Sequence, residues 1–152
     1  MMKGTKAMKN SLPVETIKSL IRSAVIGRER SYSIYSGFSV GAAVLTDDGR
    51  IFSGCNVENA SFPAGSCAET VAVNKAVSEG AKHITAIAII GGKAALSSST
   101  DSYTFPCGIC RQVISEFKSP DGAIVIVARN EDDYKIFSID ELLPGAFSGD
   151  SL

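Results

Sequence analysis

The sequence lacks an excess of charge of either sign, and it lacks any long hydrophobic run. Lys and Arg together number 15 and Asp and Glu 16, so the formal net charge is −1 at pH 7. The basic residues are scattered and form no stripe that could neutralise a phosphate backbone. This argues against a polymeric nucleic-acid partner and favours a small, neutral ligand. No apolar run approaches the ~20 residues that cross a bilayer, so no membrane partner is expected.

A secretory signal is missing as well. Met1–Asn10 is rich in Lys, but no apolar segment with a cleavage site follows it. We therefore expect a flexible leader over residues 1–12, a single domain over residues 13–152 and a cytoplasmic protein. The length suits one substantial core, and 45% hydrophobic with 20% charged residues is ordinary globular composition.

Histidine and cysteine are scarce, with one and four residues, but the cysteines are clustered. Cys67-Ala68-Glu69 is followed, after a long interval, by Pro106-Cys107-Gly108-Ile109-Cys110. In a cytosolic protein such clustering indicates metal binding or catalysis more often than disulfides. The single histidine, His83, is expected at the surface with no part in coordination.

Hydrophobic periodicity predicts helices interleaved with strands. An apolar stripe at helical spacing runs along residues 13–28, with Ser11 as the expected cap and Pro13 in the first turn. Ile84–Ile90 is a nearly continuous β-branched run, typical of a strand buried on both faces. The remaining helices are expected over 67–78, 107–117 and 139–143, and the remaining strands over 40–46, 50–55, 123–128 and 134–138. This order predicts an α/β domain with a mixed five-stranded sheet between helices.

Both cysteine segments stand at predicted helix starts, where unpaired N–H groups stabilise thiolates. Three protein ligands and one open position are typical of catalytic zinc, whereas structural zinc usually has four protein ligands. Glu69, two residues after Cys67, could take a proton from a zinc-activated water and return it to a substrate. Three thiolates around divalent zinc leave a charge of −1, so we expect electropositive neighbours, with the helix termini and Arg111 as candidates.

Less specific interpretations remain open. Cys107 and Cys110 alone could form a redox dithiol, and Cys55 could complete a four-cysteine structural zinc site, but both leave Glu69 without a role. Cys55 is more simply a small buried hydrophobic residue. The polar pair Asn56 and Glu58 could merely cap a turn at a strand end.

The two cysteine segments resemble the signature of zinc nucleoside deaminases, and the chain as a whole resembles the small homotetrameric cytidine deaminases. The resemblance covers nearly everything after residue 12. Besides the cysteine segments, it rests on Tyr35–Ala43, Gly54–Ser61, Arg111–Val113 and Leu142–Pro144. It implies a three-layer α/β/α sandwich, one catalytic domain over 13–152, and a tetramer with shared active sites. The implied reaction is hydrolytic deamination of cytidine and deoxycytidine to uridine and deoxyuridine in pyrimidine salvage.

Matching positions imply roles for individual residues. Cys67, Cys107 and Cys110 would hold one zinc ion per chain. Glu69 would carry protons to the base and to the departing amine.

The implied substrate contacts come from five further positions. Asn56 and Glu58 would hydrogen-bond the ribose. Phe38, which alone would more often be a core residue than a ligand contact, would pack near the pyrimidine. The backbone N–H of Ala68 would contact the base. Phe147 would reach into a neighbouring subunit's site.

Two positions depart from the family pattern. Thr70 stands where many relatives carry an Arg that offsets thiolate charge, so the charge balance of the site lacks its expected cation. Phe105 replaces a more common Ser, but the backbone carbonyl in that region is the group that accepts from the leaving amine. Two alternative functions remain: deamination of a cytosine nucleoside antibiotic such as blasticidin S, and, outside enzymes, a zinc-stabilised interaction domain.

Overall fold

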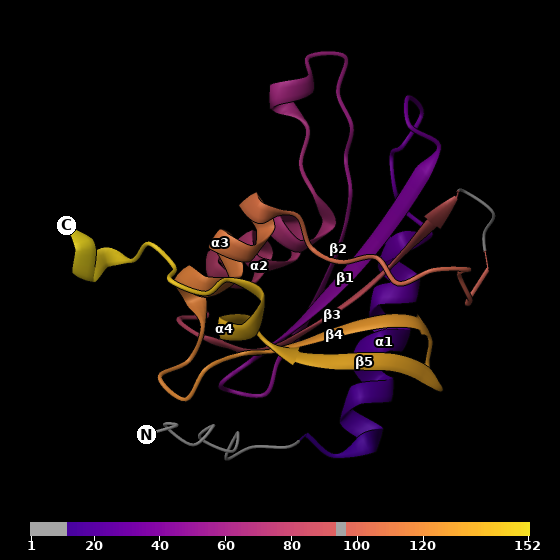
Figure 1. The fold of residues 1–152 in the computed structure, drawn as a ribbon. Helices are drawn as coiled ribbons and strands as arrows, with labels where there is room; N and C mark the ends of the chain where they lie inside the picture. Colours follow the sequence, from indigo (N-terminus) through magenta and orange to yellow (C-terminus); the bar gives the residue numbers. More distant parts are fainter. Residues whose placement is uncertain (1–11, 94–96) are drawn as a thin grey trace.

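The elements of the folded chain follow the hydrophobic pattern of the sequence. The computed structural model describes residues 12–93 and 97–152 (Figure 1). Their elements, in chain order, are α1 (Val14–Arg28), β1 (Phe38–Thr46), β2 (Ile51–Cys55), the 3-10 turn η1 (Phe62–Ala64), α2 (Ala68–Ser78), β3 (Ile84–Lys93), α3 (Gly108–Phe117), β4 (Ile124–Asn130), β5 (Asp133–Ser138), α4 (Ile139–Leu142) and the 3-10 turn η2 (Gly149–Ser151). The predicted order of helices and strands is confirmed, whereas the expected leader falls almost entirely outside the described residues.

The strands of the described chain form one five-stranded sheet in the order β2-β1-β3-β4-β5. β3 and β4 run parallel and the other neighbours antiparallel, which confirms the predicted mixed sheet. β3 lies at the centre, and its side chains alternate between two cores, with Ile87 and Ile89 in one and Ala88 and Ile90 in the other. The expected burial of this strand on both faces is confirmed.

Helices cover both faces of the sheet, as Figure 1 shows. α1 contributes Leu20 and Ile21 to the core on one face. α2, α3 and α4 contribute residues such as Val73, Ile114 and Ile139 to the core on the other. Because each face of the sheet is apolar, it needs such a cover. The result is the three-layer α/β/α arrangement that the resemblance implied.

β1 and β3 extend beyond the limits that their side-chain pattern predicts. β1 begins at Phe38 and β3 ends at Lys93, beyond the expected limits of 40 and 90. Phe38 pairs with Lys93, and Ser39 pairs with Gly92. Backbone pairing needs no apolar side chain, so the glycines that end the β-branched run still satisfy their N–H and C=O groups in the ladder.

The first helix begins one residue later than predicted. α1 starts at Val14, and Pro13 is its N-cap with an extended backbone (φ −55°, ψ 142°) instead of a residue of the first turn. The expected cap Ser11 lies outside the described residues. Among the helices in residues 12–93 and 97–152, none has the length and apolar character that crossing a membrane requires.

Two glycines allow helices to lie close to the backbone of the sheet. A Cβ atom on Gly41 would lie 1.9 Å from the carbonyl oxygen of Ala24 in α1. A Cβ atom on Gly54 would lie 2.6 Å from the nitrogen of Ala72 and 2.7 Å from the carbonyl oxygen of Ala68, both in α2. Any side chain at Gly54 would therefore push α2 away from β2, because a packed interior cannot absorb such overlap.

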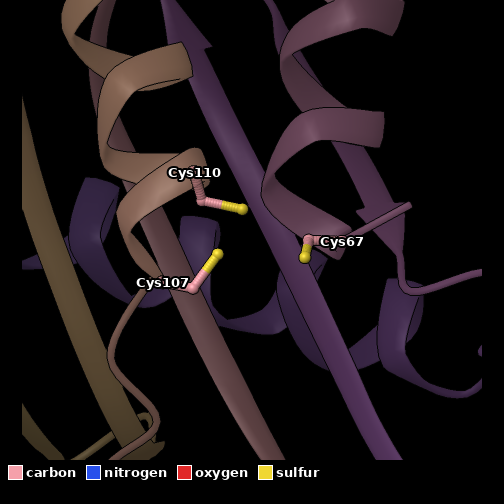
Figure 2. A group of neighbouring side chains, drawn as sticks. All are labelled: Cys67, Cys107 and Cys110. Atoms are coloured by element: carbon pink, nitrogen blue, oxygen red, sulfur yellow. The ribbon is translucent and has the colours of Figure 1, made fainter. Parts of the chain in front are cut away.

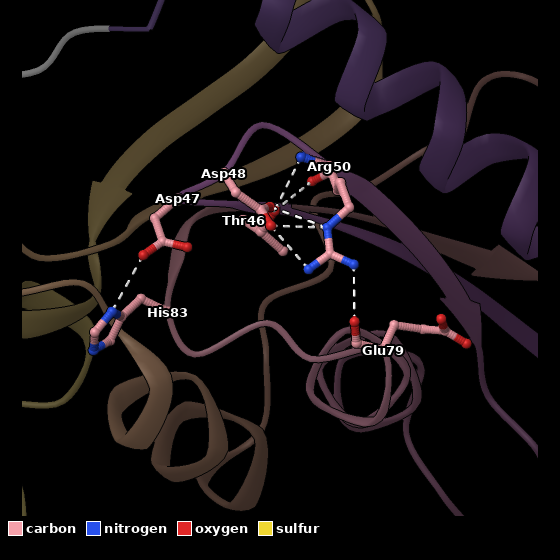
Figure 3. A network of polar contacts seen from close by, with 6 residues as sticks. All are labelled: Thr46, Asp47, Asp48, Arg50, Glu79 and His83. Atoms are coloured by element: carbon pink, nitrogen blue, oxygen red, sulfur yellow. Dashed lines mark hydrogen bonds and ion pairs between the residues drawn. The ribbon is translucent and has the colours of Figure 1, made fainter.

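A polar network ties the β1–β2 turn to the C-terminal end of α2 (Figure 3). The carboxylate of Asp48 accepts from Arg50 Nε at 3.0 Å, and Arg50 Nη1 donates to the Glu79 carbonyl at 2.9 Å. Nearby, His83 Nδ1 lies 3.3 Å from an Asp47 carboxylate oxygen, with 42% of the His83 side chain exposed. The histidine is thus near the surface, as expected, but it has a carboxylate partner that the sequence did not indicate.

Candidate functional site

Three cysteine side chains converge where two helices begin (Figure 2). Cys67 is the N-cap of α2, Cys107 is the N-cap of α3, and Cys110 lies in the first turn of α3. Their Sγ atoms all lie within 4.8 Å of one another. Cys110 is fully buried, and the other two are exposed. The predicted placement of both segments at helix starts is confirmed, and the fold brings the two starts together.

This set of donors suits zinc. Zinc binds thiolates at ~2.3 Å, and a tetrahedral arrangement then separates the sulfur atoms by about 3.8 Å. The sulfur atoms of the observed cluster, all within 4.8 Å of one another, lie near that spacing. Cys55 is not part of the cluster; it is half-buried, and its thiol donates to the Arg30 carbonyl at 3.4 Å. The four-cysteine alternative therefore does not fit.

The three thiols respond differently to their surroundings. Burial raises the pKa of Cys110 far above its ordinary value, and the nearby Glu69 carboxylate raises it further. Burial also raises the pKa of Cys67. Burial opposes ionisation of Cys107 too, but backbone N–H groups at the start of α3 bring the pKa of that thiol below its ordinary value. Three thiolates in this space repel one another and Glu69, so the deprotonated cluster favours a bound cation.

Glu69 lies beside this cluster in the first turn of α2 and is only 4% exposed. Its Oε2 atom accepts from the Cys110 thiol at 3.6 Å. Burial raises the pKa of Glu69, because the charged form loses its hydration. A carboxyl group that holds a proton at higher pH than an exposed glutamate, next to a metal-binding cluster, is suited to carrying protons.

Asn56 follows β2 directly, and its side-chain amide binds the start of β1. Its Oδ1 accepts from the Val40 N–H at 2.9 Å and from the Ser31 hydroxyl, and its Nδ2 donates to the Phe38 carbonyl at 2.8 Å. In the folded chain this side chain therefore has a structural role between the end of β2 and the start of β1. An amide nitrogen carries two N–H donors, and the Phe38 carbonyl occupies one of them.

Glu58 holds the loop that precedes β1. Its Oε1 accepts from the backbone N–H groups of Tyr35 and Ser36, each at 3.0 Å, and its Oε2 accepts from the Ser36 hydroxyl. The Ser36 side chain is the main cause that lowers the pKa of Glu58, so this carboxylate is ionised at neutral pH. A carboxylate has roughly four acceptor positions, and these bonds occupy three of them.

The other three predicted substrate contacts lie at separate places. Ala68 is the first residue of α2 and is fully buried, so its N–H is among the helix-start donors without an intrahelical partner. Phe38 begins β1 and is 37% exposed. Phe147 is 60% exposed, and Gln112 Nε2 donates to its carbonyl at 3.0 Å. The segment that carries it, after α4, extends away from the sheet in Figure 1.

Sequence reasoning missed the role of Arg28. Periodicity places this residue on the apolar stripe of α1, and it is indeed buried, at 4% exposure. Its guanidinium donates to the carbonyls of Ser39, Lys93 and Ser97 at 2.9, 2.8 and 2.9 Å. These bonds fix the start of β1 and the end of β3 beside Phe38. The sequence carries no signal for them, because every residue type has a backbone carbonyl.

Arg111 was expected as an electropositive neighbour of the thiolates. Its guanidinium instead donates to the carbonyls of Pro106 and Leu142, at 2.8 and 2.7 Å. It therefore ties α3 to the loop before it and to α4. Phe105, which like Thr70 departs from the family pattern, packs its ring against Phe137 with 5.3 Å between ring centroids.

Comparison with known proteins agrees with this geometry. The family model described as the cytidine and deoxycytidylate deaminase zinc-binding region matches residues 14–128, which include the three clustered cysteines and Glu69. The chain belongs to this family. Cytidine deaminase from Sporosarcina psychrophila is 39% identical over 137 residues, or 90% of this chain and 94% of that protein. The enzyme of the same name from Halalkalibacterium halodurans is 40% identical over 133 residues, or 88% and 95%.

Solved structures of this deaminase family have the same fold. The crystal structure of cytidine deaminase from Burkholderia pseudomallei matches with a TM-score of 0.75 and 40% identity, covering 85% of this chain and 97% of that one. Cytidine deaminase from Mycobacterium tuberculosis matches with a TM-score of 0.68 and 34% identity, covering 85% and 94%. These matches confirm the fold class that the deaminase resemblance implied.

Proposed function

We propose that this chain is a zinc-dependent cytidine deaminase that hydrolyses cytidine and deoxycytidine to uridine and deoxyuridine and releases ammonia. The observation that carries the proposal is the convergence of three cysteine sulfurs beside the buried carboxylate of Glu69. The deaminase family match and relatives named cytidine deaminase at 39% and 40% identity support the substrate class.

In this proposal Cys67, Cys107 and Cys110 hold one zinc ion per chain. A bound zinc ion supplies a water molecule whose pKa is lowered toward neutrality. Glu69 would take one proton from the water that attacks C4 of the cytosine and pass it to N3. It would then take the second proton from the hydroxyl now on C4 and deliver it to the amine, so that the bond from C4 to the amine nitrogen breaks and ammonia leaves. The burial that raises the pKa of Glu69 supports this role, because it lets the carboxyl group keep a proton between the two transfers.

The proposed ribose contacts use the donor and acceptor positions of Asn56 and Glu58 that the hydrogen bonds described above do not occupy. The second N–H of Asn56 Nδ2 donates to a ribose hydroxyl, and the fourth acceptor position of the Glu58 carboxylate accepts from a second ribose hydroxyl. The N–H of Ala68 binds the base, and Phe38 lies against the pyrimidine. The scattered basic residues and the net charge of −1 favour a free nucleoside over a nucleotide.

The proposal extends to a homotetramer with shared active sites. Several large apolar side chains are exposed in a single chain: Ile34 at 65%, Phe62 at 81%, Ile109 at 75% and Phe147 at 60%. A second copy that covers them removes this surface from water, and in our proposal Phe147 enters the neighbour's site. All four cysteines are free, which suits the reducing cytoplasm, where we place this step of pyrimidine salvage.

Replacement of Glu69 tests the proposed chemistry. Glu69→Gln is expected to retain one zinc per chain and to lower kcat for cytidine by about 10²–10⁴-fold, because the amide cannot carry a proton. Glu79→Gln, at the other end of the same helix, is the matched control and should leave kcat unchanged. Deamination is followed by ultraviolet absorbance, and zinc by elemental analysis, with and without a chelator.

The outcomes separate the alternatives. A normal rate in Glu69→Gln would show that this residue carries no proton. Zinc-loaded protein that deaminates blasticidin S but not cytidine would favour the antibiotic as substrate, and turnover of cytidine monophosphate would contradict the nucleoside preference. Zinc-loaded protein without any deaminase activity would point to an interaction domain.

A further inference from the structure

Thr70 links the two helices that carry the cysteines. It lies in the first turn of α2, and its Oγ1 atom is 3.7 Å from Cys110 Sγ, which belongs to α3. Cys110 is fully buried, and Thr70 is partly buried. The sulfur is therefore shielded from water, and the Thr70 hydroxyl lies within hydrogen-bonding reach of it.

The direction of this hydrogen bond depends on the state of the sulfur. As a thiol, Cys110 has one proton. It donates that proton either to Glu69 Oε2, at 3.6 Å, or within its contact with Thr70, where either residue can be the donor. A cysteine that binds a metal has lost its proton and can only accept. In the metal-bound state, a hydrogen bond in this contact therefore has the Thr70 hydroxyl as its donor.

This inference rests on the proposed zinc site. We propose that Thr70 is a positioning residue that strengthens metal binding by donating its hydroxyl to the Cys110 thiolate. Three thiolates exceed the charge of divalent zinc by one, and a hydrogen bond to a charged sulfur disperses part of that excess without adding a cation. The bond also holds Cys110 Sγ at a set distance from α2, so it keeps the ligands of α2 and α3 in register. Thr70 is thus a neutral substitute for the cationic side chain that the resemblance led us to expect.

Two variants separate the hydroxyl from the shape of the side chain. Thr70→Val keeps the volume and loses the hydroxyl, whereas Thr70→Ser keeps the hydroxyl and loses a methyl group. Zinc affinity is measured by competition of the full-length protein against a chromophoric chelator. Thr70→Val should bind zinc about tenfold more weakly, the lower end of the effect of such supporting groups, while Thr70→Ser should keep the wild-type affinity.

A second readout does not depend on catalysis. In protein loaded with Co²⁺, the sulfur-to-metal charge-transfer band should move to longer wavelength in Thr70→Val, because a thiolate without its hydrogen bond gives up electron density more easily. Thr70→Ser should keep the wild-type band. Thermal unfolding of the metal-free variants shows whether packing has changed.

The inference and the proposed function fail in different ways. Wild-type zinc affinity and an unchanged cobalt spectrum in Thr70→Val would overturn the role of Thr70 and leave the zinc site intact. Equal losses of affinity in Thr70→Val and Thr70→Ser would assign the residue to packing and also overturn it. Wild-type protein that binds neither zinc nor cobalt would overturn both the inference and the proposed function.

Discussion

Replacing Gly54 by alanine should move the helix that carries Cys67 and Glu69. The new Cβ atom would lie 2.6 Å from the Ala72 nitrogen, whereas ordinary contacts begin at 3.4 Å. α2 must then retreat from β2 by about 0.8 Å, and a misplacement of about 1 Å can reduce a rate about 100-fold. We expect kcat/KM for cytidine to fall by about 100-fold in Gly54→Ala, with about 1–3 kcal/mol of stability lost to overpacking.

The assay combines steady-state deamination, zinc content and thermal unfolding, with kinetics measured well below the unfolding midpoint of the variant. Gly149→Ala is the control, because a Cβ atom on Gly149 meets no atom within 4 Å. This control should match the wild type in all three measurements. Wild-type kcat/KM and an unchanged Tm in Gly54→Ala would show that α2 keeps its place without this close approach, and the reasoning would be wrong.

Two further predictions concern side chains that hold turns. Asn56→Ala should lose about 1–3 kcal/mol of stability in denaturant unfolding, because the Val40 N–H and the Phe38 carbonyl lose their partner, and should raise KM; unchanged stability would contradict this. The hydrogen bond from Arg50 lowers the pKa of Asp48 from 3.8 to about 2, so its stabilisation is present above 3.8 and lost as pH falls toward about 2. Asp48→Asn should therefore lower Tm near neutral pH, with a difference from wild type that disappears in acid; a difference independent of pH would refute the assignment.

The sequence predicted those features that depend on side-chain type. The β-branched run Ile84–Ile90 is typical of a strand buried on both faces, and it forms most of the central strand β3. Cysteines at predicted helix starts could only be brought together if those helices began side by side, as they do at Cys67 and Cys107. Both inferences used chemistry that only a few residue types possess.

The features that sequence could not predict depend on backbone partners. The extra pairing of Phe38 with Lys93, and the bonds from Arg28 to three carbonyls, involve groups that every residue carries. The sequence leaves two roles open for Asn56 and Glu58, ligand contact or turn cap. In the folded chain both side chains bind protein groups, and these bonds still leave one donor position on Asn56 and one acceptor position on Glu58. At Thr70 the sequence shows only that a cationic side chain is absent. The contact of Thr70 with Cys110 could not be predicted, because it depends on how α2 and α3 dock.

The cysteines of the cluster come from segments before and after β3 in the sequence. Cys67 belongs to the helix between β2 and β3, whereas Cys107 and Cys110 belong to the crossover between the parallel strands β3 and β4. Crossovers of this kind close long loops, so their docking is slow compared with that of local contacts. A metal ion held by all three sulfurs therefore binds most tightly to chains in which both helices have docked, and its binding energy adds to the stability of that state. Tight metal uptake during refolding should thus coincide with the docking of α2 and α3.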